Sequence, residues 1–201
     1  ESVAPDRPVG CFGKEASRFT ASLVPPGTHV RLVGDGFLLR RWGGEDLEAL
    51  LRHANDARVS RGVSDRFPFP YTRKDGEDFL AGKVVDLNDP VLAIEIGGEA
   101  CGGIGIRPGA GERSHGAELG YWLGHAHWGR GVMTRTVAMY VPWVMDQLSL
   151  LRLQATVLDI NPASARVLLK NGFSEEGTMR GAVMKHDGLH DLRLFGRLRE
   201  P

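Results

Sequence analysis

The sequence predicts a mixed α/β fold, in which a mostly antiparallel sheet is covered by helices on both faces. Two observations lead to this prediction. Most apolar segments are short and are joined in pairs by turn residues, as around Gly34-Asp35-Gly36, which is typical of antiparallel hairpins. The apolar segment 151–158 instead lies between two segments with helical periodicity, which indicates a crossover connection beside the hairpins.

The first half of the expected domain contains a hairpin, two helices and a second hairpin. Leu47, Leu50 and Leu51 form the apolar face of the first helix, and Thr72 caps the second helix with Asp75 three residues further on, as in a capping box. The predicted strands are 30–33, 37–41, 91–96 and 101–106, and the predicted helices are 45–55 and 72–85.

The second half alternates strands and helices and ends in a hairpin. Pro142 predicts a kink in the long helix, because proline removes a hydrogen bond and clashes with the preceding turn. Asn161 is the expected N-cap of the last helix, with Pro162 at its first position. The predicted order is strand 117–123, helix 132–148, strand 151–158, a helix that ends at Asn171-Gly172, and two strands around residues 185–188.

Length and composition indicate an ordinary globular chain. The 201 residues suggest one domain and a tail. Residues 1–27 are irregular and contain several prolines, so we expect an N-terminal arm or linker there and a single domain over residues 28–201. The 25 basic and 25 acidic side chains give a net charge of zero, which argues against nucleic acid or a membrane surface as the main partner.

The cysteine content and the hydropathy pattern predict a cytoplasmic protein. Cys11 and Cys101 are too few for a disulfide framework, so we expect two free thiols in a reducing compartment. No apolar run approaches the ~20 residues that a membrane-spanning helix needs. The first residues also lack the basic and then apolar pattern of a signal peptide.

The segment from Trp128 to Thr134 is the most informative part of the chain. It is a glycine-punctuated turn between a strand and the start of a helix. Such a turn directs several backbone N–H groups into one concavity, where the positive end of the helix dipole also favours negative charge. We therefore expect a cradle for a phosphate-bearing cofactor.

Three segments together resemble the GNAT superfamily of N-acetyltransferases, and within it the RimJ/RimL-type branch that acetylates the N-termini of ribosomal proteins. They are Glu118–Leu123, Trp128–Thr134 and Asn161–Gly177, in the order and spacing of that family. The resemblance implies acetyl-CoA as cofactor, an amine as acceptor and a sheet that splays where the pantetheine enters, helped by a bulge near Leu119 to Leu123. It implies cofactor contacts at Leu123, Trp128, Gly129, Arg130, Gly131, Val132, Met133, Thr134 and Asn161.

The resemblance also implies two catalytic residues. An amine attacks only when neutral, and a lysine-like amine has a pKa of ~10.4, so a base is needed. Glu118, on the strand before the cradle, is the expected base, either directly or through a water, and an ordinary ion-paired glutamate is the alternative. Ser164 is the expected acid for the departing thiolate, and the alternative is a serine that only satisfies helix amides.

Several alternatives stay open from the sequence. The acceptor is either a protein N-terminus or a small amine. Met133 replaces a small residue of the family pattern and suggests a non-catalytic, acetyl-CoA-binding sensor as the second function. Phe67, Phe69 and Tyr71 either cover the acceptor or pack their own loop onto the sheet, and His190-Asp191 either lines the acceptor pocket or is an exposed pair.

No metal is expected, and the transfer is expected to be direct, without an acyl-enzyme. His115, His125 and His127 would share a face if they lay on one strand, but cysteine and acidic partners at ligand spacing are missing. Neither cysteine lies in a motif suited to a nucleophile. The N-terminal arm could reach a second subunit, so a homodimer is an alternative to a monomer.

Overall fold

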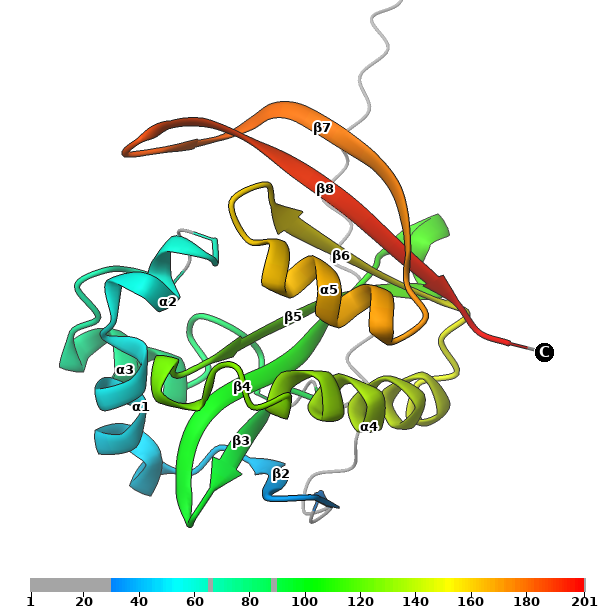
Figure 1. The fold of residues 1–201 in the computed structure, drawn as a ribbon. Coiled ribbons are helices and arrows are strands. Elements are labelled where there is room, and N and C mark those ends of the chain that lie inside the picture. The colour runs from blue at the N-terminus through cyan, green and yellow to red at the C-terminus, as the bar shows by residue number, and fades with distance from the viewer. Residues whose placement is uncertain (1–29, 65–66, 88–89, 201) are drawn as a thin grey trace, which may run out of the picture.

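A single eight-stranded sheet organises the chain (Figure 1). The computed structural model describes residues 30–64, 67–87 and 90–200. The sheet order is β1-β2-β3-β4-β5-β6-β8-β7, and every neighbouring pair is antiparallel except β5 and β6. The strands are β1 (Arg31–Gly34), β2 (Phe37–Arg41), β3 (Leu92–Ile96), β4 (Glu99–Pro108), β5 (Gly116–Leu123), β6 (Arg152–Leu158), β7 (Ser174–Lys185) and β8 (Gly188–Leu198).

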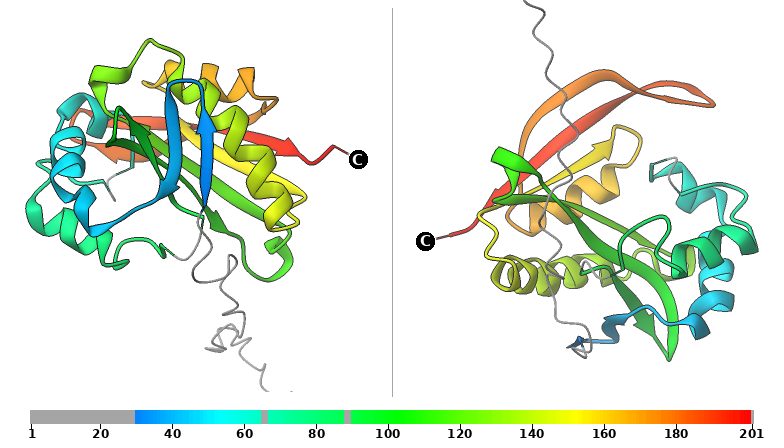
Figure 2. Two further views of the ribbon diagram at one scale, coloured as in Figure 1. Left: turned by 90° about the horizontal axis from the view of Figure 1, so that it is seen from below. Right: turned by 180° about the vertical axis from the view of Figure 1, so that it is seen from behind.

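Helices cover both faces of this sheet, as the sequence predicts (Figure 2). On one face, Leu50 of α1 packs in a cluster with Trp42 and Trp122. On the other face, Tyr140 of α4 packs in a cluster with Leu119 of β5 and many other apolar side chains. The helices are α1 (Leu47–Ala54), α2 (Ala57–Arg61), α3 (Arg73–Leu80), α4 (Val132–Gln147) and α5 (Pro162–Lys170), and three short 3-10 helices are η1 (Gly44–Asp46), η2 (Gly111–Arg113) and η3 (His125–His127).

The sheet splays between β5 and β6. These two strands pair only from Gly116–Arg152 to Glu118–Gln154 and then diverge. The bulge predicted near Leu119 to Leu123 was wrong, because the β4–β5 ladder is regular along its whole length, up to the Gly102–Leu123 pair. The separation therefore comes from the divergence of two parallel strands and not from an extra residue.

Helix α4 continues past Pro142 as one element of 16 residues. The missing N–H leaves the carbonyl of Ala138 without its helical partner. Both Pro142 and Ala138 lie on the exposed side of the helix, so water can satisfy that carbonyl. Exposure explains why a proline is tolerated there.

The structure also differs from the predicted elements in detail. The predicted helix 45–55 is η1 followed by α1, and α3 ends at Leu80 instead of near residue 85. Helix α2 was missed, although Asp56 caps it by accepting a 2.8 Å hydrogen bond from the Arg58 amide. The capping box of Thr72 and Asp75 is confirmed.

Some of the sequence-based predictions concern residues that the structure does not describe. Residues 1–27, with Cys11, belong to that part, so the arm and the domain boundary stay predictions. Among the helices that the structure describes, none has the length and apolar character needed to cross a membrane.

We predict that Leu153→Ala lowers the free energy of unfolding by about 2–5 kcal/mol, because Leu153 is fully buried between β6 and the helical layer. Leu151→Ala is the matched control, since its side chain is 56% exposed, and should stay within about 0.5 kcal/mol of the wild type. Urea denaturation measures both. Equal losses in the two variants would contradict the described core.

Candidate active site

A large cleft opens where β5 and β6 part. Its volume is about 1420 Å³. Its walls include the diverging segments Gly120–Leu123 and Ala155–Leu158, the turn before α4 and the start of α5. Helix α2 and the aromatic loop around Phe67 close its other side.

The turn before α4 has the conformation that the anion-cradle prediction requires. Gly129 has a φ of 73° and Gly131 a φ of 69°, in the left-handed region that favours glycine. Gly131 is the N-cap of α4 and has no side chain that could accept from the first-turn amides. The N–H groups of Val132, Met133 and Thr134 have no partner within the helix at this end. The cradle therefore offers free amides to an anion.

The side chains of Trp128 and Met133, at the two ends of the cradle, each have a packing role. The Trp128 indole N–H donates a 2.7 Å hydrogen bond to the carbonyl of Leu123, which fastens the turn to the end of β5. Met133 packs part of its side chain against the main core. Its bulk is thereby accommodated partly in the core, although the residue also borders the cleft.

Glu118 lies on the cleft wall with two polar partners. Its Oε1 atom accepts a 3.3 Å hydrogen bond from Thr156 on β6, and its Oε2 atom lies 3.2 Å from an Arg107 guanidinium nitrogen. The Arg107 side chain is 61% exposed, so solvent weakens this ion pair. Glu118 thus has a hydrogen-bond donor on β6 and an exposed cation as its partners.

Ser164 lies against Tyr121, a residue that the sequence analysis missed. The Tyr121 hydroxyl lies 2.9 Å from the Ser164 hydroxyl and donates a 3.2 Å hydrogen bond to the Ser164 carbonyl. Burial raises the pKa of Tyr121 to about 12, so its phenol stays protonated at neutral pH. Alternation along β5 could have found Tyr121, because it shares a face with Leu119 and Leu123.

The same alternation separates the two predicted catalytic residues. Glu118 lies on the face of β5 that Trp122 shares, toward α1, whereas Tyr121 and Ser164 lie on the face covered by α4 and α5. The structure therefore brings Ser164 to Tyr121 and not to Glu118. The gap between β5 and β6 lies between the two groups, so they approach it from opposite sides.

Asn161 links the two sides of the cleft. Its side-chain oxygen accepts from the Ser164 amide at 3.1 Å, which confirms the N-cap prediction. Its side-chain amide donates to the carbonyl of Gly62, just after α2, at 3.0 Å. Both side-chain polar groups thus have protein partners, and the expected cofactor contact of Asn161 stays a prediction.

The aromatic loop packs onto the sheet and also borders the cleft, and its role as a cover over the acceptor stays a prediction. The Phe67 ring packs 5.1 Å from Trp122 and 5.2 Å from Tyr71, measured between ring centroids, and all three border the cleft. Phe69 is 51% exposed and does not border it. Phe67 and Tyr71 therefore both pack onto the sheet and shape the cleft wall.

His190 and Cys101 do not contribute chemistry to the cleft. His190 is held between Asp187 at 2.9 Å and Asp159 at 3.0 Å, and these carboxylates raise the pKa of its ring. Cys101 is buried, and burial raises the pKa of its thiol to about 11, so it is a poor nucleophile at neutral pH. Neither residue borders the cleft.

The three histidines weighed as metal ligands do not share a strand face. His115 precedes β5, whereas His125 and His127 follow it in η3. The eight residues of β5 separate the two ends by roughly 26 Å at the usual rise per residue. Helical geometry in η3 also turns His125 and His127 in different directions.

Comparison with known families identifies the domain. The acetyltransferase (GNAT) domain profile matches residues 37–174. The chain belongs to the GNAT acetyltransferase family. In this GNAT chain the matched region contains strands β2 to β6, the cradle and helix α5.

Relatives agree with this assignment. YjcK of Bacillus subtilis (strain 168), named a probable N-acetyltransferase, is 44% identical over 67 residues, which cover 33% of this GNAT chain and 37% of YjcK. The ribosomal-protein-serine acetyltransferase of Escherichia coli (strain K12) is 32% identical over 82 residues, 41% of this chain and 46% of that enzyme. The chain thus matches less than half the length of these relatives.

A solved structure of RimL, a ribosomal alpha-N-protein acetyltransferase in complex with coenzyme A, has the same fold. The TM-score is 0.73 at 20% identity, and the match covers 83% of this GNAT chain and 96% of RimL.

We predict that Asn161→Ala lowers the free energy of unfolding by about 1–2 kcal/mol, because the variant loses the helix cap and leaves the Gly62 carbonyl without its donor. Asn161→Ser retains a capping oxygen and removes the donor to Gly62 without adding a charge, so it should lose less stability. Thermal and urea unfolding compare the two variants. A larger loss in Asn161→Ser would contradict the capping role.

Proposed function

We propose that this chain transfers an acetyl group from acetyl-CoA directly to a primary amine, with a peptide or protein N-terminus as the acceptor. The observation that carries the proposal is the cradle at the start of α4, which opens onto the gap between β5 and β6. Anion-binding amides beside an unpaired strand edge suit a cofactor that has a diphosphate and an extended arm.

Residues of the turn and of β5 would hold the cofactor. The free amides from Gly129 to Thr134 suit the diphosphate, with Arg130 adding a positive charge nearby. The backbone of β5 between Leu119 and Leu123 has no pairing with β6, so its polar groups can bond an extended arm. The Trp128 indole N–H already donates to the Leu123 carbonyl, so the part of the β5 edge that is open to the cofactor arm ends at Leu123. Acetyl-CoA, when bound, supplies an acetyl group activated as a thioester.

Glu118 is the general base of this proposal. The acceptor arrives as an ammonium, which a carboxylate attracts and can deprotonate directly or through a water. The exposed Arg107 can yield its place beside Glu118 to that ammonium, while the Thr156 hydroxyl keeps the carboxylate in position. Glu118 passes this first proton on to solvent. The neutral amine nitrogen then forms the new bond to the acetyl carbon as the carbon–sulfur bond breaks, and the second proton that the nitrogen loses goes to Glu118.

Ser164 and Tyr121 form the acid side. As the carbon–sulfur bond breaks, the departing thiolate needs a proton. The two hydroxyls are hydrogen-bonded to one another, so a proton that leaves one can be replaced from the other. The high pKa of the Tyr121 phenol keeps this pair protonated until the transfer. The roles of Glu118 and Ser164 rest on their positions on opposite sides of the gap.

The size of the cleft and one relative support a protein N-terminus over a small amine. Small-molecule sites usually occupy about 300–1,000 Å³, and this cleft of about 1420 Å³ leaves room for both a cofactor arm and an extended chain end. The Escherichia coli relative is named for a ribosomal-protein acceptor. A cytoplasmic location, an absence of nucleic-acid and membrane partners, and a monomer or homodimer all stay predictions.

We predict that the purified chain binds coenzyme A and acetylates peptides at their α-amino groups in a panel of peptides and small amines. Calorimetry measures coenzyme A binding, a free-thiol assay measures turnover, and product mass identifies the acceptor. Acetylation of small amines but not of peptides would show that the acceptor is a small amine and not a protein N-terminus. Binding without turnover would favour the acetyl-CoA sensor, and an absence of binding would contradict the proposal.

Glu118→Gln should lower kcat about 10²–10⁴-fold at pH 7 and leave the Kd for coenzyme A unchanged. The deficit should shrink above about pH 8, because an α-amino acceptor with a pKa of about 8 then loses its proton to solvent. Glu112→Gln, in the exposed helix η2, is the matched control and should behave as the wild type. An unchanged kcat in Glu118→Gln would show that Glu118 is not the base and is only an ion-pair partner of Arg107.

A further inference from the structure

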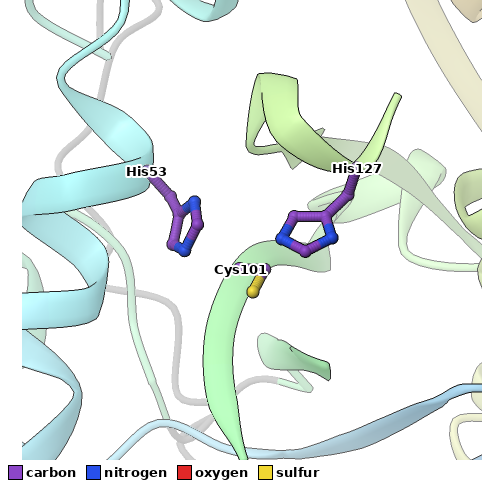
Figure 3. A group of neighbouring side chains, drawn as sticks. All are labelled: His53, Cys101 and His127. Carbon is purple, nitrogen blue, oxygen red and sulfur yellow. The ribbon is translucent and has the colours of Figure 1, made fainter. Parts of the chain in front are cut away.

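Three side chains from distant parts of the chain converge beside the cradle (Figure 3). His53 comes from α1, Cys101 from β4 and His127 from η3. One ligand atom of each lies within 4.8 Å of the other two. Figure 3 shows the sulfur and the two rings turned toward a common centre. The function described above uses none of these three groups.

Two nitrogen atoms of this cluster lack partners. Nε2 of His53 and Nδ1 of His127 are buried and have no hydrogen-bond partner in the described part of the chain. The Glu99 Oε1 atom lies 3.6 Å from Nε2, which is longer than a hydrogen bond. Leaving a buried polar atom unsatisfied costs about 1–3 kcal/mol. Two such atoms in one place indicate a missing ligand.

The groups of the cluster are of the kind that bind a cation. An imidazole binds a metal ion through the lone pair of a ring nitrogen, and one nitrogen of each ring has no partner in the described part of the chain. The Cys101 thiol donates to the Glu99 carbonyl at 3.2 Å. A bound cation would displace the thiol proton to solvent and take up the sulfur as thiolate.

We propose that His53, Cys101 and His127 form a binding site for a divalent cation of the zinc type. Two imidazoles and one thiolate are ligands that Zn²⁺ takes in tetrahedral sites, whereas Mg²⁺ and Ca²⁺ prefer oxygen. The Glu99 carboxylate lies beside His53 and can complete the coordination, although its Oε1 atom also pairs with Arg52. A second cavity of about 240 Å³, bordered by His53, Asp56 and His125, gives the ion a route from solvent.

Such an ion would act on the cofactor loop. His127 is followed directly by Trp128, the first residue of the cradle. The ion would connect this point to α1 and to β4, where the Gly124 amide already donates to the Cys101 carbonyl at 2.7 Å. The metal site thus orders the entrance of the cradle, and its existence does not depend on the acceptor or on catalysis.

Titration of the metal-free full chain with Co²⁺ tests this site. We expect a thiolate-to-cobalt absorption band that saturates at one ion per chain and disappears when Zn²⁺ is added. Cys101→Ser should abolish the band and Cys11→Ser should retain it. This pair of results would identify Cys101 as the source of the thiolate ligand. A missing band, or a band that follows Cys11, would overturn the proposal.

His127→Ala keeps the buried thiol and tests the site even if Cys101→Ser does not fold. Its Co²⁺ affinity should fall by more than the roughly 10–100-fold that loss of an outer hydrogen-bond partner of a ligand costs. His115→Ala, at the other end of β5, is the matched control and should bind as the wild type. Zn²⁺ should also raise the unfolding temperature of the wild type, reversibly with a chelator, but not that of His127→Ala. Equal affinities in the two histidine variants would exclude the cluster.

Discussion

Strands β5 and β6 share three residue pairs and then separate, and the rest of the site depends on that separation. A parallel pair that stayed in register would satisfy its own backbone groups and leave no space between its strands. By parting after Glu118 and Gln154, the two strands open a cleft inside the sheet and expose the edge of β5 to a ligand. Helix α4 then covers the core face of the same strands, so its N-terminus faces the cleft instead of solvent.

Side-chain alternation along β5 turns this gap into a two-sided site. Residues on one face of the strand meet α1 and the aromatic loop, and residues on the other face meet α4 and α5. A thioester in the gap would therefore have a carboxylate on one side and a hydroxyl pair on the other. The left-handed conformations of Gly129 and Gly131 turn the chain from the end of β5 into α4, which places the anion-binding amides at the mouth of the same gap.

Local chemistry made most of the fold predictable. Turn residues and caps such as Gly34-Asp35-Gly36, Thr72 and Asn161 act within a few residues, so the sequence shows them directly, and they are confirmed. Long-range contacts were not predictable in this way. The Tyr121–Ser164 pair and the meeting of His53, Cys101 and His127 depend on sheet register and helix placement, which no local pattern encodes. The prediction of a bulge in β5 was wrong for the same reason. The divergence depends on how β5 and β6 pair with each other, which the sequence of neither strand shows by itself.

The double hydrogen bonding of Asn161 has a consequence for how the two halves of the cleft respond to their ligands. One amide side chain is bonded both to the first turn of α5 and to the segment after α2, on two different walls of the cleft. Lys185 of the closing hairpin adds a second tie by donating to the Val63 carbonyl at 2.9 Å. A ligand that shifted Gly62 or Val63 would strain these hydrogen bonds to α5 and to the closing hairpin, so the two walls of the cleft are tied together through main-chain carbonyls.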